Sequence, residues 1–320
     1  MTYPAQGQSA VLMLCPLPAP VQQNIEEKYS VLCAWEFDDP YAKIAERADS
    51  VIAIVTSGAT GVDDRWLDLL PRLSVIASFG VGTDGINLQR IAELGVQVSI
   101  TPGVLDDCVA DTALGLLIDV VRGISLADRF VRNGGWLKAG FPLQPRLRGK
   151  VCGIAGMGNI GRAIAARAQA FGMQVAYCAR REVPGLALTH YDDIKALAEV
   201  SDFLVLALPG GLNTRHLVNK DVLQALGASG FLINVSRGSV VDKLALVEAL
   251  ETGGIAGAGL DVFSDEPHVP DALLALDNVV LTPHVASATT ETRAAMAQLV
   301  WDNLEAFFHT GAVLTPVKAG

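Results

Sequence analysis

The sequence lacks the features that would indicate a membrane, secreted or metal-binding protein. No apolar run reaches the roughly 18 residues that span a bilayer. The five cysteines are an odd number, widely scattered and without a C-x-x-C pair, which argues against a disulfide framework or a metal site. The segment from Met1 to Pro20 has no basic residue and contains three prolines after residue 15, unlike a secretory signal peptide. We therefore expect a cytoplasmic protein with no membrane partner.

Positive charge is also scarce. The chain has 24 Lys and Arg against 34 Asp and Glu, for a formal net charge of −10. An acidic chain repels phosphate backbones and anionic lipids, so we expect no nucleic-acid partner. A site for an anionic substrate would have to create local positive potential, and this makes single basic residues in Gly-rich, apolar surroundings informative.

The residues that are present indicate an α/β fold with parallel sheets. The 320 residues are 51% hydrophobic and long enough for two domains. Short β-branched runs alternate with helical patterns, which is typical of βαβ units. Helices are expected at 87–94, 106–123 and 289–309. Strands are expected at 11–14, 51–55, 75–78, 96–100, 151–155, 175–178, 203–208, 231–235, 256–260 and 279–281.

A Gly-rich segment predicts a dinucleotide site. Gly156, Gly158 and Gly161 have G-x-G-x-x-G spacing, after an apolar strand and at the start of an Ala-rich helix. The first glycine allows a tight turn, the second lets backbone approach a pyrophosphate, and the third lets the helix pack on the strand. The alternative is a Gly-rich turn without a ligand. The predicted cofactor-binding residues here are Gly156, Met157, Gly158, Asn159, Ile160 and Gly161.

The end of the next strand favours NADP(H) over NAD(H). NAD enzymes usually carry Asp or Glu near this position, where the carboxylate accepts hydrogen bonds from the ribose 2′-OH. This chain has Ala179, Arg180 and Arg181 instead. A guanidinium makes paired, charge-assisted hydrogen bonds to a 2′-phosphate. The alternative is two solvated surface arginines.

Three ionisable residues follow strands in the second half of the chain and suit the reduction of a 2-keto acid. Hydride transfer leaves negative charge on the carbonyl oxygen, and His284 suits the proton donor because histidine titrates near neutral pH. Glu266 would orient the imidazole and favour its protonated form. Arg237 would bind a carboxylate and polarise the adjacent carbonyl. Taken one at a time, each of these residues could instead be a solvent-exposed loop residue without a catalytic role. Together they predict NADPH-dependent reduction of a small 2-keto acid to a 2-hydroxy acid.

Six segments resemble the D-isomer-specific 2-hydroxyacid dehydrogenase family over nearly the whole chain. They are S-F-G-V-G-T-D-G-I, D-x-x-V-A-D-x-A-x-G-L-L, G-M-G-N-I-G, N-V-S-R-G-S-V-V-D, G-L-D-V-F-x-D-E-P and T-P-H-V-A-S-A-T. Within the family the chain looks most like the NADPH-dependent glyoxylate/hydroxypyruvate reductases, including the plant hydroxyphenylpyruvate reductase type.

The resemblance implies a homodimer of two-domain subunits, each with two Rossmann-like domains and helices on both faces of the sheets. The substrate domain is discontinuous, at residues 1–102 and 289–320, and the dinucleotide-binding domain is 103–288. The implied product is the D-2-hydroxy acid. Trp136 matches a position near the dimer contact, and as a lone aromatic residue it favours a packing role over substrate recognition.

The resemblance also implies roles for single residues. Arg237, Glu266 and His284 match the family's catalytic Arg, Glu and His. The backbone of Gly80-Val81-Gly82 would bind the substrate carboxylate, with Val81 and Gly82 as substrate-binding residues, and Ser287 matches a polar position near the substrate. The implied cofactor-side residues are Leu208, Pro209, Thr214, Val235, Ser236 and Asp261; for Thr214 and Asp261, local hydrogen bonding is the alternative. Ala179 departs from the Ser of many related NADPH enzymes.

Two other functions stay open at this point. One is an NAD-dependent dehydrogenase for another acid, such as phosphoglycerate, D-lactate or formate, which Arg180 and Arg181 disfavour. The other is a non-catalytic, dinucleotide-sensing co-regulator, which the complete Arg, Glu and His set disfavours.

Overall fold

The computed structural model describes residues 10–317, and these form two compact units. Unit 1 contains the described residues up to Leu105 and those from Thr289 onward, and unit 2 is Asp106–Ala288. The chain passes from unit 1 to unit 2 after Leu105, whereas the sequence analysis puts the boundary after residue 102. Residues 1–9 and 318–320 of the predicted substrate domain, and the start of the segment compared with a signal peptide, lie outside the described residues.

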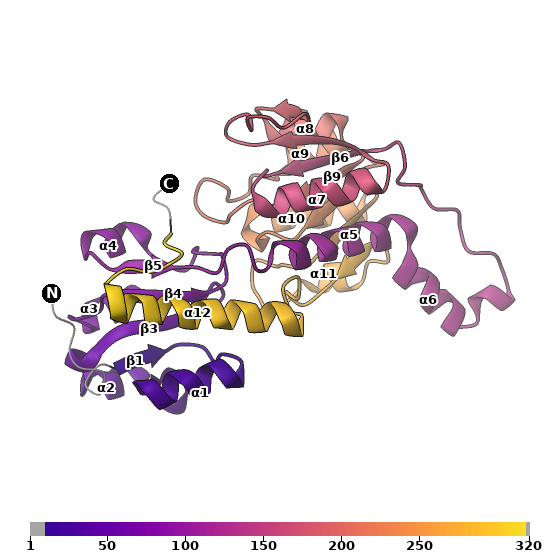
Figure 1. Cartoon of the computed structure of the whole chain (residues 1–320). Helices are drawn as coiled ribbons and strands as arrows, with labels where there is room; N and C mark the ends of the chain where they lie inside the picture. The colour runs from indigo at the N-terminus through magenta and orange to yellow at the C-terminus, as the bar shows by residue number, and fades with distance from the viewer. Residues whose placement is uncertain (1–9, 318–320) are drawn as a thin grey trace. The chain divides into compact units, whose positions relative to one another are not determined.

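Unit 1 is an α/β layer structure around a parallel sheet with the strand order β2-β1-β3-β4-β5 (Figure 1). Its elements are β1 Ala10–Met13, α1 Ala19–Lys28, β2 Ser30–Cys33, α2 Pro40–Ala45, β3 Val51–Ser57, α3 Asp64–Leu69, β4 Val75–Phe79, α4 Leu88–Glu93, β5 Gln97–Ser99 and α12 Thr290–Thr310. The C-terminal helix α12 packs beside β4, so the two ends of the chain build one unit.

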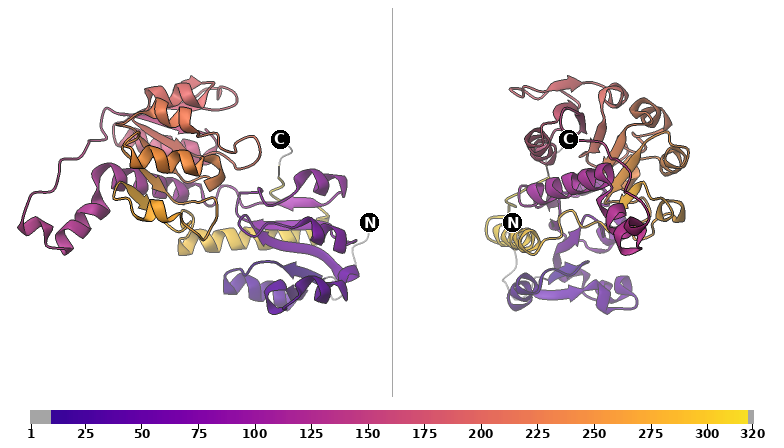
Figure 2. Two further views of the ribbon diagram at one scale, coloured as in Figure 1. Left: turned by 180° about the vertical axis from the view of Figure 1, so that it is seen from behind. Right: turned by 90° about the vertical axis from the view of Figure 1, so that its right-hand side faces the viewer.

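The three central strands of unit 1, β1, β3 and β4, are buried on both faces, which explains their almost continuous apolar sequence. Leu12, Ile54 and Ile76 belong to a core shared with α2, α3 and α4. Their neighbours along each strand point to the opposite face because side chains alternate. On that face α1 and α12 contribute buried side chains such as Ile25 and Leu304. Figure 2 shows helices on both faces of each sheet.

Unit 2 is a seven-stranded parallel sheet with the order β12-β11-β10-β9-β6-β7-β8. Its elements are α5 Asp106–Arg122, α6 Ile124–Arg132, β6 Val151–Ala155, α7 Asn159–Ala170, β7 Gln174–Cys178, β8 Thr189–Tyr191, α8 Ile194–Val200, β9 Phe203–Leu206, α9 Lys220–Leu226, β10 Phe231–Asn234, α10 Lys243–Glu251, β11 Gly257–Leu260, α11 Asp271–Leu274 and β12 Val279–Leu281. The strand order reverses between β6 and β9, and dinucleotides bind at such a switch point in open α/β sheets.

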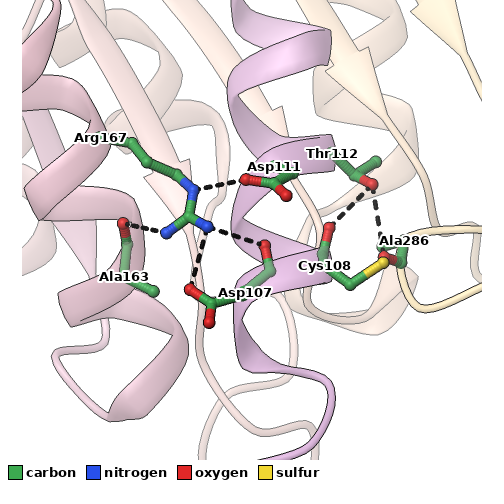
Figure 3. A network of polar contacts seen from close by, with 7 residues as sticks. All are labelled: Asp107, Cys108, Asp111, Thr112, Ala163, Arg167 and Ala286. Carbon is green, nitrogen blue, oxygen red and sulfur yellow. Dashed lines mark hydrogen bonds and ion pairs between the residues drawn. The ribbon is translucent and has the colours of Figure 1, made fainter. Parts of the chain in front are cut away.

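Ion pairs join the first two turns of α5 to α7 (Figure 3). Arg167 on α7 donates from Nε to Asp111 at 2.6 Å and from Nη2 to Asp107 at 2.9 Å. The residue that follows Asp111 on α5, Thr112, donates its hydroxyl to the carbonyl oxygen of Ala286 at 3.3 Å. Helix α5 is therefore attached both to the helix that follows the Gly-rich loop and to the loop after β12.

The predicted fold class is confirmed. The strand predictions differ from the structure at the edge strands of the sheets and at the last residues of two strands. The sequence analysis missed β2 and β8, which are short strands in the outermost positions of their sheets. The strands expected at 203–208 and 231–235 end at Leu206 and Asn234. The residues beyond those ends are still apolar, so hydropathy extended both strands into their loops. No helix among the described residues is both long and apolar enough to cross a membrane.

Candidate functional site

The loop between β6 and α7 has the conformation that a pyrophosphate-binding turn needs. Gly156 has φ +97°, and a Cβ there would overlap the carbonyl oxygen of Ala207. A Cβ on Gly161 would overlap the backbone of Gly156, which explains the third glycine. Gly158 differs because no atom lies within 4 Å of the position its Cβ would take. The backbone at Gly158 and the following α7 N–H groups of Asn159 and Ile160 are therefore open to an anionic ligand.

His284 and Glu266 form a hydrogen-bonded pair at the carboxyl ends of β11 and β12. Glu266 Oε2 lies 2.7 Å from His284 Nδ1, and Glu266 Oε1 accepts a hydrogen bond of 2.9 Å from the backbone N–H of Phe263. Both side chains are part-exposed, at 31% for Glu266 and 40% for His284. Because Nδ1 is bonded to the carboxylate, Nε2 is the ring nitrogen left to meet a substrate.

The electrostatics of this pair keep Glu266 ionised. Burial raises the pKa of the Glu266 carboxyl. The hydrogen bonds from His284 and Phe263 and the charges of His284 and Arg237 lower it by more, so that the net pKa is below the ordinary 4.5. A carboxylate held in this form accepts the hydrogen bond at Nδ1 and so orients the imidazole.

Arg237 follows β10 on the neighbouring loop, and its backbone is positioned by a buried asparagine. Asn234 Oδ1 accepts from the backbone N–H and the hydroxyl of Ser236, and Asn234 Nδ2 donates to the Arg237 carbonyl at 3.0 Å. The next residue, Gly238, packs against the loop that carries Glu266, because a Cβ on Gly238 would overlap the backbone of Phe263 and Ser264. The absence of a side chain at Gly238 therefore lets the Arg237 and Glu266 loops approach each other.

A buried carboxylate fixes the loop that carries His284. Asp261 is fully buried and accepts hydrogen bonds from the Thr282 hydroxyl at 2.6 Å and from the N–H groups of Val285 and Ala286 at 2.8 and 2.9 Å. His284 itself has φ +53°, a left-handed conformation that a non-glycine residue adopts only where its surroundings impose it. Asp261 therefore positions the histidine, consistent with the local hydrogen bonding considered as the alternative to a cofactor contact.

The predicted 2′-phosphate residues follow β7 at the other side of the switch point. Ala179 is part-buried, and Arg180 and Arg181 are exposed. Within residues 10–317, neither arginine has an ion pair, although Asp and Glu outnumber Lys and Arg in the chain. Their guanidinium groups are thus available for an anion.

The other predicted cofactor-side residues lie in the loops after β9 and β10. Leu208 and Pro209 follow β9, and the Thr214 hydroxyl donates to the Pro209 carbonyl at 2.8 Å, closing the 209–214 loop. Val235 and Ser236 are buried directly after β10. Thr214 therefore forms a local hydrogen bond within its loop, which is the role that the sequence analysis gave as the alternative to a cofactor contact.

Val81 and Gly82 lie in unit 1, in the loop after β4. The preceding Gly80 donates its N–H to the Thr101 hydroxyl at 3.0 Å and accepts from the Thr101 N–H at 2.8 Å. The N–H groups of Val81 and Gly82 donate no hydrogen bond within the described residues, so both are free for a ligand. Ser287, in unit 2, is part-buried three residues after His284.

The sequence comparisons identify the family. Residues 114–286 match the pattern of the D-isomer specific 2-hydroxyacid dehydrogenase, NAD binding domain. The chain is 43% identical to glyoxylate/hydroxypyruvate reductase A of Arabidopsis thaliana, over 96% of this chain and 98% of the relative. It is 44% identical to hydroxyphenylpyruvate reductase of Plectranthus scutellarioides over the same shares of the two chains. The chain belongs to the D-isomer specific 2-hydroxyacid dehydrogenase family. The predicted family and dehydrogenase class are confirmed.

A solved member of the family has the same fold. The NADPH-dependent glyoxylate/hydroxypyruvate reductase from Sinorhizobium meliloti, in complex with NADP and malonate, superposes with a TM-score of 0.91 at 44% identity, over 97% of each chain.

The sequence analysis missed the positioning roles of Asn234 and Gly238. Asn234 as the last residue of an apolar strand was a usable signal, because asparagine forms hydrogen bonds with the backbone that follows it. The packing of Gly238 depends on a distant loop and leaves no local signal.

Proposed function

We propose that the protein is an NADPH-dependent reductase that converts a small 2-keto acid of the glyoxylate/hydroxypyruvate class to the D-2-hydroxy acid. The observation that carries the proposal is the His284–Glu266 hydrogen bond of 2.7 Å on loops of the NAD binding domain, with Arg237 beside it on the next loop. The reductase names of the relatives support the substrate class.

In this proposal the protein residues bind the acid, polarise its carbonyl and supply a proton. The nicotinamide, when bound, supplies the hydride. The Arg237 guanidinium binds the carboxylate and draws electron density from the adjacent carbonyl. His284, held through Nδ1 by Glu266, donates the Nε2 proton to the carbonyl oxygen as negative charge develops there. The free N–H groups of Val81 and Gly82 bind the substrate carboxylate, which makes unit 1 the substrate domain, and Ser287 contacts the substrate.

The residues of unit 2 fit a dinucleotide with a 2′-phosphate. The open backbone at Gly158 and the N-terminus of α7 would receive the pyrophosphate. Arg180 and Arg181, which have no ion pair in the described part of the chain, would bind the 2′-phosphate. The complex of the Sinorhizobium meliloti relative with NADP supports the same choice of cofactor.

We further propose that the protein is a cytoplasmic homodimer. Helix α6 projects from the body of unit 2 together with the chain that follows it (Figure 1), and none of its residues is buried. Trp136 is 70% exposed and Leu137 93% exposed in this arm, and exposed large apolar groups of this kind mark interfaces. Five free cysteines support a reducing compartment. Measurement of the mass in solution tests the dimer.

The deciding experiment follows oxidation of NADPH and NADH by absorbance with glyoxylate, hydroxypyruvate, pyruvate and phenylpyruvates. We expect NADPH with glyoxylate or hydroxypyruvate to give the highest kcat/KM. Higher turnover with NADH and another acid would instead support the NAD-dependent alternative. Binding of NADPH without turnover on any of these acids would support the co-regulator.

A further inference from the structure

Arg293 lies where β4 ends, outside the set of residues assigned so far. It is in the first turn of α12, and its guanidinium carbon is 5.3 Å from the centre of the Phe79 ring. Phe79 is the last residue of β4 and is only 8% exposed, so the ring is held in place by the core of unit 1. The aromatic face attracts the cation and holds the flexible arginine side chain over the strand end.

The charge of Arg293 is not neutralised in the part of the chain that the structure describes. Two other part-buried arginines each contact two carboxylates: Arg90 contacts Asp64 and Asp68, and Arg167 contacts Asp107 and Asp111. Arg293 has the Phe79 ring but no carboxylate within 4.0 Å. The nearby N-terminus of α12 is the positive end of the helix dipole and does not stabilise a cation. In a chain of net charge −10, a part-buried arginine without an acidic partner indicates an anionic ligand.

The loop that continues from Phe79 presents the complementary donors. Gly80 has φ +137°, and both of its backbone polar groups are bonded to Thr101. The next two residues, Val81 and Gly82, have N–H groups with no acceptor among the described residues. One strand end of unit 1 therefore carries a fixed turn, two free amide donors and an unpaired guanidinium.

We propose that Arg293 is a substrate-binding residue that attracts and binds the carboxylate of the 2-keto acid together with the amides of Val81 and Gly82. The inference rests on the proposed function and deepens it, because it assigns the anion selectivity of unit 1 to one side chain. A guanidinium matches the two oxygens of a carboxylate, so the predicted substrate class is 2-oxo monocarboxylates rather than uncharged aldehydes.

The test compares Arg293→Ala and Arg293→Gln with Arg65→Ala. Arg65 is a matched control, since its guanidinium carbon lies 3.8 Å from the Tyr41 ring centre in the same unit and it also has no ion pair with any residue between 10 and 317. We expect both Arg293 variants to raise KM for the keto acid about 10- to 100-fold, the value of one charged hydrogen-bonding group, with little change in kcat or KM for NADPH. Added guanidinium ion should restore part of the lost kcat/KM in Arg293→Ala, which a purely structural role would not allow.

Binding of oxamate, an unreactive mimic of a 2-keto acid, gives a second readout by calorimetry in the presence of NADP. We expect Arg293→Gln to weaken oxamate binding about as much as it raises KM, and Arg65→Ala to leave both unchanged. An active wild type whose Arg293→Gln variant keeps its KM and its oxamate affinity would overturn the inference. A wild type that reduces no 2-keto acid would instead overturn the proposed function, and the oxamate comparison would still test Arg293.

Discussion

The loop that carries His284 and the turn that carries Arg180 follow strands of the same sheet, but their polar groups are satisfied in opposite ways. Around His284, Asp261 accepts three hydrogen bonds, and the Glu266 carboxylate is hydrogen-bonded to Nδ1 of the histidine ring. Arg180 and Arg181 have no ion pair among the described residues. Under the proposed function, the fold itself orients the proton donor, whereas recognition of the cofactor 2′-phosphate is left to arginines that only the ligand would pair. Substitutions at the first loop should impair chemistry, and those at the second should impair cofactor choice.

The largest effect is expected at His284. His284→Asn should lower kcat by about 100-fold or more, since a general acid contributes at least that much. Asparagine tolerates positive φ, so the backbone at this position is not strained by the change. Steady-state kinetics at saturating NADPH measure the loss, and the affinity for NADPH should stay within a factor of two or so, since the change adds or removes no net contact to the phosphates. Full activity in this variant would mean that another group donates the proton.

The complementary change is at Arg180 and Arg181. Replacing both with alanine should raise KM for NADPH about 10- to 100-fold, because hydrogen bonds to charged groups are lost, and should leave KM for NADH unchanged. The ratio of kcat/KM for the two cofactors measures this. Arg132→Ala is the control, since Arg132 is an exposed arginine of the same unit that is paired with Asp128. A cofactor ratio equal to that of the wild type would remove the 2′-phosphate assignment.

Gly238 tests whether close approach of two loops is needed. Gly238→Ala places a methyl group against the backbone of Phe263 and Ser264, so the Glu266 loop must move away from Arg237. We expect kcat/KM for the keto acid to fall about 10-fold, which corresponds to roughly 1.4 kcal/mol of lost transition-state stabilisation. Gly115→Ala is the matched control: no atom lies within 4 Å of its added Cβ, and alanine favours its position in α5. Equal activity of the two variants would contradict a coupling of the loops.

The smallest effect is a shift in the pH profile of Glu266→Gln. The pKa of the wild-type carboxyl is lowered from its ordinary 4.5, so the group stays ionised at neutral pH, 2.7 Å from the His284 ring. Glutamine keeps a hydrogen bond but removes the negative charge, and the loss of a nearby anion disfavours a cationic proton donor. We expect the alkaline fall in the rate of reduction to move to lower pH by about one unit. An unchanged profile of kcat/KM against pH would show that Glu266 does not act on His284 electrostatically.

Much of the fold was predictable because buried parallel strands are strongly apolar and lie between helical patterns. β6 and β12 begin and end at the predicted residues, and α5 ends one residue earlier than expected. β8 was missed because an edge strand with the sequence Thr-His-Tyr has little hydropathy signal.

The predictability of the candidate site depends on how local its chemistry is. Gly156, Gly158 and Gly161 were recognisable because one short turn contains the whole requirement. The meaning of Arg293 depends on its position over Phe79, which lies far away in the sequence, and no local pattern encodes that contact. The hydrogen bonds from Thr282 to Ala286 onto Asp261 likewise exist only once β11 and β12 pair.

The packing of α12 on the first sheet has a consequence for biosynthesis. Buried side chains of this last helix, among them Met296, Val300 and Phe307, cover a face whose strands are complete by Ser99. Unit 2 is one uninterrupted stretch and can finish folding while the ribosome is still translating, but unit 1 keeps that apolar face open until α12 has been synthesised. A nascent chain stalled before residue 290 would therefore be a strong client for chaperones that bind exposed hydrophobic surface.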